Sequence, residues 1–350
     1  MVDVAVLGGG IVGCTIAREL LTREPDVDVT VIERDMVGSG ASRRSAGLHI
    51  PRGTNATVRD MTAYSQGYWS AERVVTPDLP IFPIPMTVVA DARRAGAVEQ
   101  SYRPARNFQR VVDHARAEGE LVWQVSGAQY ADVYELTRRF AAELRPRAQI
   151  HEGQRVVGLD VRPDGVDVWL GGGDVRADRV VIAPGPWLAD PAWHELLAPL
   201  RLRVKRVVAL HVAAPVEPGD GVTVYEDEDA FLLPLARHGY WLFSYTSRHW
   251  DVHPDRDVGG LTRAERTAAT AALARCAPHL VGQVAGARVF CDAYSPDRVP
   301  VITRLDPSGR VLFAGATNGS GYRLAPAVAA RAVDFLTHHG ASAAPTRRSA

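Results

Sequence analysis

The feature that most constrains this chain is a glycine-rich segment near its start. An apolar run over residues 2–7 leads into Gly8, Gly10 and Gly13, and a helix-patterned run over residues 11–21 follows. This is the G-x-G-x-x-G spacing between a strand and a helix, the context that a dinucleotide-binding turn requires. The first glycine makes the tight bend, the second lets backbone approach a pyrophosphate, and the third lets helix and strand pack closely.

An acidic residue follows at the position that such a unit needs. A second apolar run, residues 29–32, ends at Glu33, which lies about 20 residues after Gly13, where an acid binds the hydroxyls of a ribose. The helix start, with Ile11 and Val12, would face the phosphates with free N–H groups. The unit therefore predicts a bound dinucleotide, either FAD or NAD, and the alternative is an ordinary strand–helix turn.

Composition limits the class of protein and its partners. The chain has 350 residues, of which 46% are apolar and 23% charged, as in ordinary globular proteins of one or two domains. Forty basic and forty acidic side chains cancel, which argues against nucleic acid or an anionic membrane surface as partner. Lys205 is the only lysine, so nearly all of the positive charge is arginine.

Cysteine spacing and hydropathy predict a location. The three cysteines lack any C-x-x-C spacing, which argues against a disulfide framework or a metal site and favours a reducing cytoplasm. The sequence opens on the first strand without a signal peptide, and no apolar run reaches the length of a membrane span. We therefore expect a cytoplasmic protein without a membrane partner.

The stretch at residues 38–53 is rich in small residues and arginine and has no helical or strand period, so we expect a long loop. Ser42 and backbone N–H groups there would bind phosphates, with charge from Arg43 or Arg44, and the alternative is a solvated loop. The glycine turn, Glu33-Arg34 and this Gly-Ala-Ser…Ala-Gly-Leu loop, in this order, resemble the D-amino-acid oxidase and glycine oxidase family of flavoproteins. The segment VLFAGATNGSGYRLAPAVAA, residues 311–330, extends the resemblance over most of the chain.

The resemblance implies an α/β (α+β) fold with a Rossmann-like FAD-binding domain and a second, sheet-based substrate domain. The implied bounds are 1–75, 128–199 and 291–340 for the first domain, 76–127 and 200–290 for the second, and 341–350 for a flexible tail. It implies FAD, not NAD, and because covalent relatives carry a histidine where Arg44 aligns, we expect a dissociable flavin. The implied cofactor contacts are Gly8, Gly10, Ile11, Val12, Gly13, Glu33, Arg34, Ala41, Ser42, Arg43, Arg44, Ala46, Gly47, Leu48, Val156, Gly185, Thr317, Asn318, Gly319, Ser320, Gly321, Tyr322 and Arg323.

Periodicity predicts the remaining elements. Helices are expected at 54–75, 92–118, 132–144 and 261–274, with a last helix entering at residue 325. Strands are expected at 81–89, with edge character because of nearby prolines, and at 156–159, 166–170, 175–182, 203–212, 230–235, 240–245 and 311–314. The stripe of Met61, Tyr64, Tyr68 and Trp69 is expected in the core.

The reaction implied by the resemblance is FAD-dependent oxidation of a C–N bond beside a carboxylate, with imine hydrolysis and formation of H2O2 from O2. Asp292 and Gly319 stand where glycine oxidases carry arginines, and Phe231 replaces a tyrosine. The carboxylate would then be bound by Arg52, Arg298 or Arg323, and no protein nucleophile is required. These substitutions predict a larger or less polar substrate, such as an N-carboxymethyl amino acid that yields glyoxylate and an amine in secondary metabolism.

Three alternatives remain open from the sequence. The strand expected at 240–245 lacks the lysine that some relatives place near the flavin, so a dehydrogenase with another electron acceptor is one alternative. An NAD-dependent dehydrogenase and a flavin-binding protein without turnover are the others.

Overall fold

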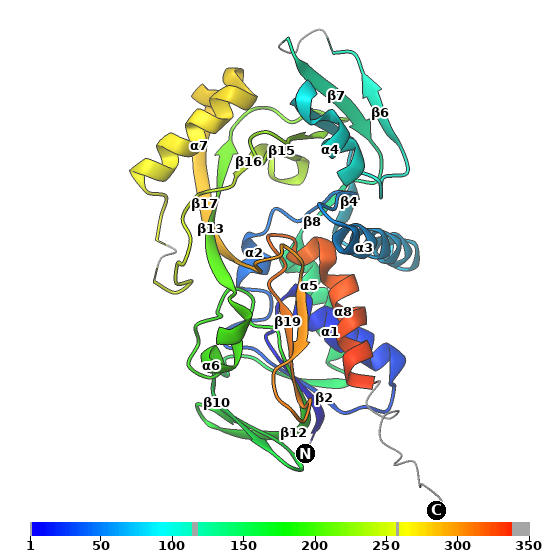
Figure 1. Cartoon of the computed structure of the whole chain (residues 1–350), viewed down its shortest axis with the longest axis vertical. Helices are drawn as coiled ribbons and strands as arrows, with labels where there is room; N and C mark the ends of the chain where they lie inside the picture. The colour runs from blue at the N-terminus through cyan, green and yellow to red at the C-terminus, as the bar shows by residue number, and fades with distance from the viewer. Residues whose placement is uncertain (1, 114–117, 257–258, 338–350) are drawn as a thin grey trace, which may run out of the picture.

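The computed structural model describes residues 2–113, 118–256 and 259–337. These residues form two large sheets, one in the lower half and one in the upper half of Figure 1. The flexible tail predicted at 341–350 lies outside the described residues. No helix in the described ranges is both long enough and apolar enough to cross a bilayer.

The first sheet is built on the predicted dinucleotide unit. Its strands run in the order β10 (Val156–Arg162), β11 (Gly165–Leu170), β12 (Gly173–Ile182), β1 (Val2–Leu7), β2 (Val29–Ile32) and β9 (Ala148–His151), and β19 (Val311–Gly315) joins β12 and carries β18 (Val301–Arg304). The pairs of β1 with β2 and β12, of β2 with β9 and of β12 with β19 are parallel. Residues 4–7 are buried throughout, as expected of a parallel strand covered on both faces.

Helices cover one face of this sheet. They are α1 (Ile11–Arg23), α3 (Ala56–Val75), α5 (Val133–Leu144) and α8 (Gly321–Thr337), and their apolar sides share one core with Val6 and Val31. On the other face, Ala5, Leu7 and Ile32 share a second core with residues of β10 and β11, of the short helix α6 (His194–Leu197) and of the turn η2 (Ala198–Leu200). The first sheet thus lies between two apolar layers and presents the carboxyl ends of its parallel strands toward the upper sheet (Figure 1).

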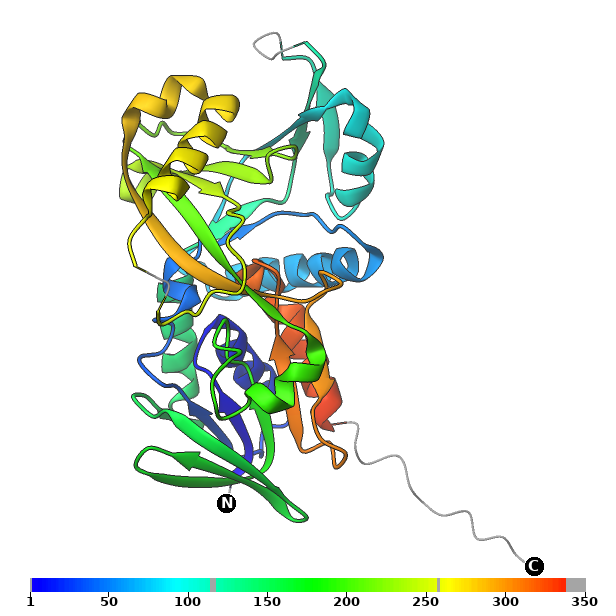
Figure 2. The ribbon, with the colours of Figure 1, turned by 60° about the vertical axis from the view of Figure 1, so that its left-hand side comes forward.

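The second sheet lies over those strand ends. Its order is β17 (Val284–Tyr294), β13 (Arg203–Val212), β16 (Tyr240–Tyr245), β15 (Ala230–Leu235), β14 (Val222–Tyr225), β5 (Met86–Asp91), β7 (Glu120–Val125) and β6 (Phe108–Val111). The helix α7 (Arg263–Cys276) and the turn η4 (Pro278–Gln283) pack on its outer face, and η3 (Ala236–His238) joins two of its strands. The long strands β13 and β17 run from this sheet down toward the first one (Figure 2). A small third sheet joins β3 (Leu48–His49), β8 (Gln129–Ala131) and β4 (Ile81–Pro83).

Most predicted elements are confirmed, and the strands at 203–212, 230–235 and 240–245 have the predicted bounds. The prediction of a long loop at 38–53 is wrong in detail, because this segment contains a short helix, α2 (Ala41–Arg44), and the strand β3. The single strand expected at 81–89 is two strands. The first, β4, lies at the edge of the small sheet, as expected, whereas β5 has neighbours on both sides, because the prolines lie before it and not inside it.

Two helix predictions and one core residue also need correction. Residues 92–111, in place of the single helix expected at 92–118, form a helical turn, η1 (Ala92–Arg94), a helix, α4 (Ala95–Ser101), and then strand β6, because Phe108 stacks 5.3 Å from Tyr102. The last helix begins at Gly321, not residue 325, because Tyr322 is buried and Pro326 is tolerated inside the helix. Tyr64 is 45% exposed, outside the core that Met61 and Trp69 enter.

Candidate functional site

A cavity of about 410 Å³ runs between the two large sheets. At one end it is lined by the glycine turn, Glu33 and Val156, and at the other by residues of β13 to β17 and by the loop between β19 and α8. Its size is within the range of small-molecule and cofactor sites. Because it begins at the carboxyl ends of parallel strands, it lies where open α/β sheets bind ligands.

The glycine turn leaves room for a ligand at one position only. A Cβ on Gly13 would lie 1.9 Å from the carbonyl oxygen of Gly8, and one on Gly8 would lie 2.2 Å from that of Ala183. A Cβ on Gly10 would meet nothing closer than Ser42 Oγ, at 3.4 Å, and Gly10 lines the cavity. Gly8 and Gly13 are therefore required by packing, whereas Gly10 keeps the backbone accessible to a ligand.

The start of α1 and the segment at Ser42 face the same space. The Ile11 N–H donates to Ser42 Oγ at 3.0 Å, so the Ser42 hydroxyl keeps its own hydrogen for a ligand in the cavity. No side chain caps α1, whose N-cap residue is Gly10. Backbone N–H groups at a helix N-terminus favour an anion such as a phosphate.

Glu33 lies at the end of β2 and is held by backbone. Its carboxylate accepts the N–H of Gly9 at 2.7 Å and that of Asp35 at 3.0 Å. Burial raises the pKa of Glu33, and these two hydrogen bonds oppose the rise. A fixed acceptor with remaining lone pairs fits a pair of ribose hydroxyls.

The structure brings most of the predicted cofactor residues to this cavity. Those that line it are Gly8, Gly10, Ile11, Val12, Glu33, Arg34, Ala41, Ser42, Ala46, Gly47, Leu48, Val156, Gly185, Thr317, Asn318, Gly319, Ser320, Gly321, Tyr322 and Arg323. Gly13 packs against Gly8 and does not line it. Arg43 and Arg44 are exposed and do not line it either, and Arg43 instead lies 5.4 Å from the ring of Tyr134.

The loop between β19 and α8 is held in a strained conformation. Ala316, Asn318 and Gly319 have φ values of 50°, 55° and 76°. Asn318 donates its N–H to Ala293 O at 3.0 Å, and its Oδ1 accepts the N–H of Ser295 at 3.0 Å. The loop is thus fixed to the end of β17, with the start of α8 directed at the cavity. Left-handed residues maintained by such contacts cluster at functional sites.

Two guanidinium groups lie together at the substrate end, and one of them pairs with a buried carboxylate. Arg52 pairs with Glu226 at 2.7 Å, and Tyr102 Oη donates to the same carboxylate at 2.8 Å. Arg323 donates to Arg52 O at 2.9 Å and to Ser320 Oγ at 2.7 Å. Burial, together with the charge of Arg52, lowers the pKa of Arg323 to about 10. This cluster therefore carries an excess positive charge in a place where a ligand carboxylate would neutralise it.

The remaining predicted substrate residues, Phe231, Asp292 and Arg298, also line this end. Sequence reasoning missed Lys205 and Trp250, which line it with them. The Lys205 ammonium lies 4.9 Å from the centroid of the Trp250 ring. The sole lysine of an arginine-rich chain was the signal that could have identified Lys205.

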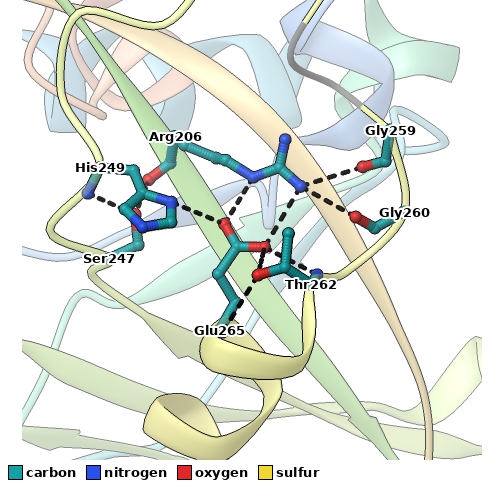
Figure 3. Close-up of polar contacts among 7 residues, drawn as sticks. All are labelled: Arg206, Ser247, His249, Gly259, Gly260, Thr262 and Glu265. Atoms are coloured by element: carbon teal, nitrogen blue, oxygen red, sulfur yellow. Dashed lines mark hydrogen bonds and ion pairs between the residues drawn. The ribbon is translucent and has the colours of Figure 1, made fainter.

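A polar cluster around Arg206 and Glu265 lies on the outer face of β13 (Figure 3). The Arg206 guanidinium donates to Glu265 at 2.5 Å and to the carbonyls of Gly259 and Gly260, each at 3.0 Å. The Arg206 N–H donates to His249 O at 2.9 Å, so that residues 249–251 run beside β13 with Trp250 opposite Lys205. Alternation along this short pairing directs Arg206 outward and both Lys205 and Trp250 toward the cavity.

Together, the fold and the cavity define a protein that binds a dinucleotide, with the second sheet over the substrate end of the cavity. The chain belongs to the DAO family of FAD dependent oxidoreductases, whose family model matches residues 3–335. The cofactor is therefore FAD, which takes two electrons from a substrate carbon and passes them to an acceptor. The glycine turn, Ser42 and Glu33 would hold its phosphates and ribose, and the loop at 316–321 would face its ring.

Solved structures share this fold. Glycine oxidase from Geobacillus kaustophilus is 20% identical with a TM-score of 0.79, and the alignment covers 96% of this chain and 94% of that one. L-proline dehydrogenase from P. horikoshii is 20% identical with a TM-score of 0.80, covering 96% and 93%. L-amino acid deaminase from Proteus vulgaris is 16% identical with a TM-score of 0.77, covering 96% and 93%. No curated protein sequence matches the chain.

Proposed function

We propose that the protein is an FAD-dependent oxidase that cleaves the C–N bond of an amino acid or N-substituted glycine. The observation that carries this proposal is the pair of guanidinium groups at the cavity wall, of which Arg52 pairs with the Glu226 carboxylate and Arg323 donates to two neutral oxygens. A substrate carboxylate would neutralise the excess positive charge of the two arginines and fix the position of the substrate in the cavity. The solved glycine oxidases and amino acid oxidases with the same fold agree with this class of substrate.

The side chains would act by binding and orientation. Arg52 and Arg323 would hold the carboxylate, so that the hydrogen on the adjacent carbon faces the loop at 316–321. Accurate placement of the reacting carbon accounts for a large part of the rate in such a site. The amine becomes an imine, which water hydrolyses, and O2 is reduced to H2O2.

The apolar walls favour a substrate larger than glycine. Val207, Val224, Phe231 and Phe290 line the cavity at the substrate end and would contact a retained apolar chain. An N-carboxymethyl amino acid would place its glycyl carboxylate at the guanidinium pair and its longer chain against these residues. Cleavage would give glyoxylate and a free amine, which suits a step in secondary metabolism.

We also propose the domain bounds, the dissociable FAD and the cytoplasmic location stated from the sequence. The two-sheet architecture supports a first domain of 1–75, 128–199 and 291–340 and a second of 76–127 and 200–290. Limited proteolysis of the apoprotein would test these bounds. Release of the flavin by acid would test the absence of a covalent bond.

The function is tested by anaerobic addition of N-alkyl glycines and of D- and L-amino acids to the yellow protein. We expect at least one N-substituted glycine to bleach the flavin, and the same compound in air to yield glyoxylate and H2O2. Bleaching without peroxide would assign a dehydrogenase with another acceptor. If no compound of the panel bleaches the flavin, the proposed substrate class is wrong.

A further inference from the structure

Two opposite charges face the substrate end of the cavity and do not pair. Lys205 on β13 and Asp292 on β17 are direct cross-strand partners, so both side chains lie on the same face of the second sheet. Both line the cavity. Within the described residues, neither the Lys205 ammonium nor the Asp292 carboxylate has a hydrogen bond or an ion pair shorter than 4 Å. The Lys205 ammonium lies instead 4.9 Å from the Trp250 ring and 5.5 Å from the Tyr294 ring, whereas a carboxylate on a cavity wall without a hydrogen bond or ion pair indicates a polar ligand.

We propose that Asp292 binds the ammonium group of the substrate and takes its proton before the C–N bond is oxidised, and that Lys205 keeps Asp292 ionised. This inference rests on the proposed function, because it assumes an amine substrate whose carboxylate lies at Arg52 and Arg323. It adds an acid–base role for a residue that stands where glycine oxidases carry a carboxylate-binding arginine.

The position of Asp292 supports this role. A Cβ built on Gly319 would lie 3.7 Å from Asp292 Oδ2, so the carboxylate abuts the loop that would face the flavin ring. Asn318 and Ala293 are joined by a backbone hydrogen bond of 3.0 Å, which fixes this approach. Arg323 lies in the first turn of α8, directly after the same loop. An α-amino acid held by its carboxylate at Arg323 would therefore have its nitrogen near the wall that carries Asp292.

The charges around Asp292 suit a proton acceptor. Burial raises its pKa to about 6, and the positive charge of Lys205 opposes the rise. The other titratable groups on this wall are Tyr294 on β17, Arg298 after β17 and Asp229 in the turn between β14 and β15. Asp229 and Arg298 act on Lys205 in opposite directions. A base with a pKa near 6 is ionised at neutral pH and can accept and release a proton.

In the proton transfer, the N–H bond of the ammonium breaks, its electron pair stays on nitrogen, and the proton forms an O–H bond with the Asp292 carboxylate. The neutral amine can then be oxidised, since its lone pair stabilises the developing positive charge on the carbon. Asp292 returns the proton to water when the product leaves.

The test compares two ligands that cannot be oxidised. 2-Aminoisobutyrate carries an ammonium and a carboxylate but no hydrogen on its α-carbon, and trimethylacetate replaces the ammonium by a methyl group. Their affinities are measured from the change in flavin absorbance between pH 5 and 9, for the wild-type holoenzyme and for Asp292→Asn, Lys205→Met and Asp229→Asn. Asp229→Asn is the matched control, because it removes a different negative charge from the same cavity. Flavin content and circular dichroism show whether each variant is folded.

We expect the wild type to prefer 2-aminoisobutyrate at pH 8 by about tenfold, the size of one charge-assisted hydrogen bond. The preference should fall as Asp292 is protonated below about pH 6. It should disappear in Asp292→Asn, persist in Asp229→Asn, and be lost at a higher pH in Lys205→Met, because removal of the cation raises the Asp292 pKa. With an amine that bleaches the wild-type flavin, Asp292→Asn should bleach about 100-fold more slowly at pH 7 and recover at high pH.

The inference is overturned if the wild type has no preference for 2-aminoisobutyrate, or if Asp292→Asn keeps that preference. Should Asp292→Asn fail to fold, the pH dependence of the wild type and the shift in Lys205→Met decide the question. Failure of the proposed function has a different signature, in which trimethylacetate does not bind and no amine bleaches the flavin. If trimethylacetate binds and an amine bleaches the flavin, but Asp292→Asn behaves like the wild type, then only the role of Asp292 is refuted.

Discussion

The two ends of the cavity are built in different ways. The cofactor end is assembled mainly from backbone groups and one carboxylate within a short stretch of chain. On either side of Gly10, the Gly9 N–H donates to Glu33 and the Ile11 N–H donates to Ser42. The substrate end is assembled from side chains on β13, β15, β17 and α8, and from Arg52. Backbone groups suit a cofactor that does not vary. Side chains suit a particular substrate, because the substrate end can be adapted by changing them one at a time.

The electrostatics differ in the same way. The Glu33 carboxylate is satisfied by two backbone N–H groups, so it is fixed before any ligand binds. At the other end, Arg52 pairs with Glu226 and Arg323 donates to neutral oxygens, and Lys205 and Asp292 face each other without an ion pair between them. The cofactor end should therefore tolerate little change, and the substrate end should change specificity before it loses its fold.

The largest effect is expected at the glycine turn. Gly13→Ala would force a Cβ to 1.9 Å from Gly8 O, and we expect it to abolish folding or to cost at least about 3 kcal/mol. The control, Gly10→Ala, should fold normally but lose FAD affinity, because its Cβ enters the cavity. Chemical denaturation and flavin content measure both. Equal loss of stability in the two variants would contradict the separate roles of these glycines.

A smaller but still large effect is expected on the outer face of β13. Arg206→Met removes one partner of a buried ion pair, whose side chains are 6% and 3% exposed, and should lower the free energy of unfolding by about 3 kcal/mol. The matched control is Arg203→Met, which breaks an exposed pair with Asp251 and should change stability little. Thermal unfolding followed by circular dichroism compares them. Similar midpoints for both variants would refute the supporting role of the buried cluster.

The guanidinium pair should govern carboxylate binding. Arg52→Met and Arg323→Met should each weaken trimethylacetate binding about 100-fold, because each removes charge-assisted hydrogen bonds. Arg298→Met, at an exposed residue of the same cavity, should leave the affinity within a few-fold. The affinities are read from flavin absorbance. A larger loss in Arg298→Met than in the other two would move the carboxylate site to Arg298.

The smallest effect is a pH dependence at the cofactor end. Burial raises the pKa of Glu33, so its charge reduces the stability of the apoprotein as pH rises through that pKa. Ribose hydroxyls would donate to the charged form, so FAD should bind more tightly over the same rise in pH, by about tenfold. Glu33→Gln should bind more weakly and lose this dependence. A dependence that persists in Glu33→Gln would assign it to another group.

The cofactor end was predictable from sequence because its residues are close together along the chain. Gly8, Gly10, Gly13 and Glu33 follow a fixed spacing, and the strands between them have a clear apolar pattern. Gly13 packs against Gly8 instead of lining the cavity, and the charged loop residues do not reach it, since the short helix α2 turns Arg43 and Arg44 to the surface.

The substrate end was less predictable for a physical reason. Lys205 and Asp292 are far apart along the chain and meet only through the register of β13 with β17. Trp250 reaches the cavity because residues 249–251 pair with β13, which no local pattern signals. Likewise, residues 92–118 have a polar, helix-like composition, yet Phe108 is drawn into a strand by aromatic stacking on Trp123 at 5.7 Å. Tertiary contacts of this kind override local propensity.

The visible absorbance of the purified protein tests the central claim most directly, namely that one FAD lies along the cavity from Glu33 to the loop at 316–321. We predict a flavin spectrum with one FAD per chain, either as isolated or after reconstitution of the apoprotein, and its loss in Gly10→Ala. A protein that stays colourless after incubation with FAD would contradict the account.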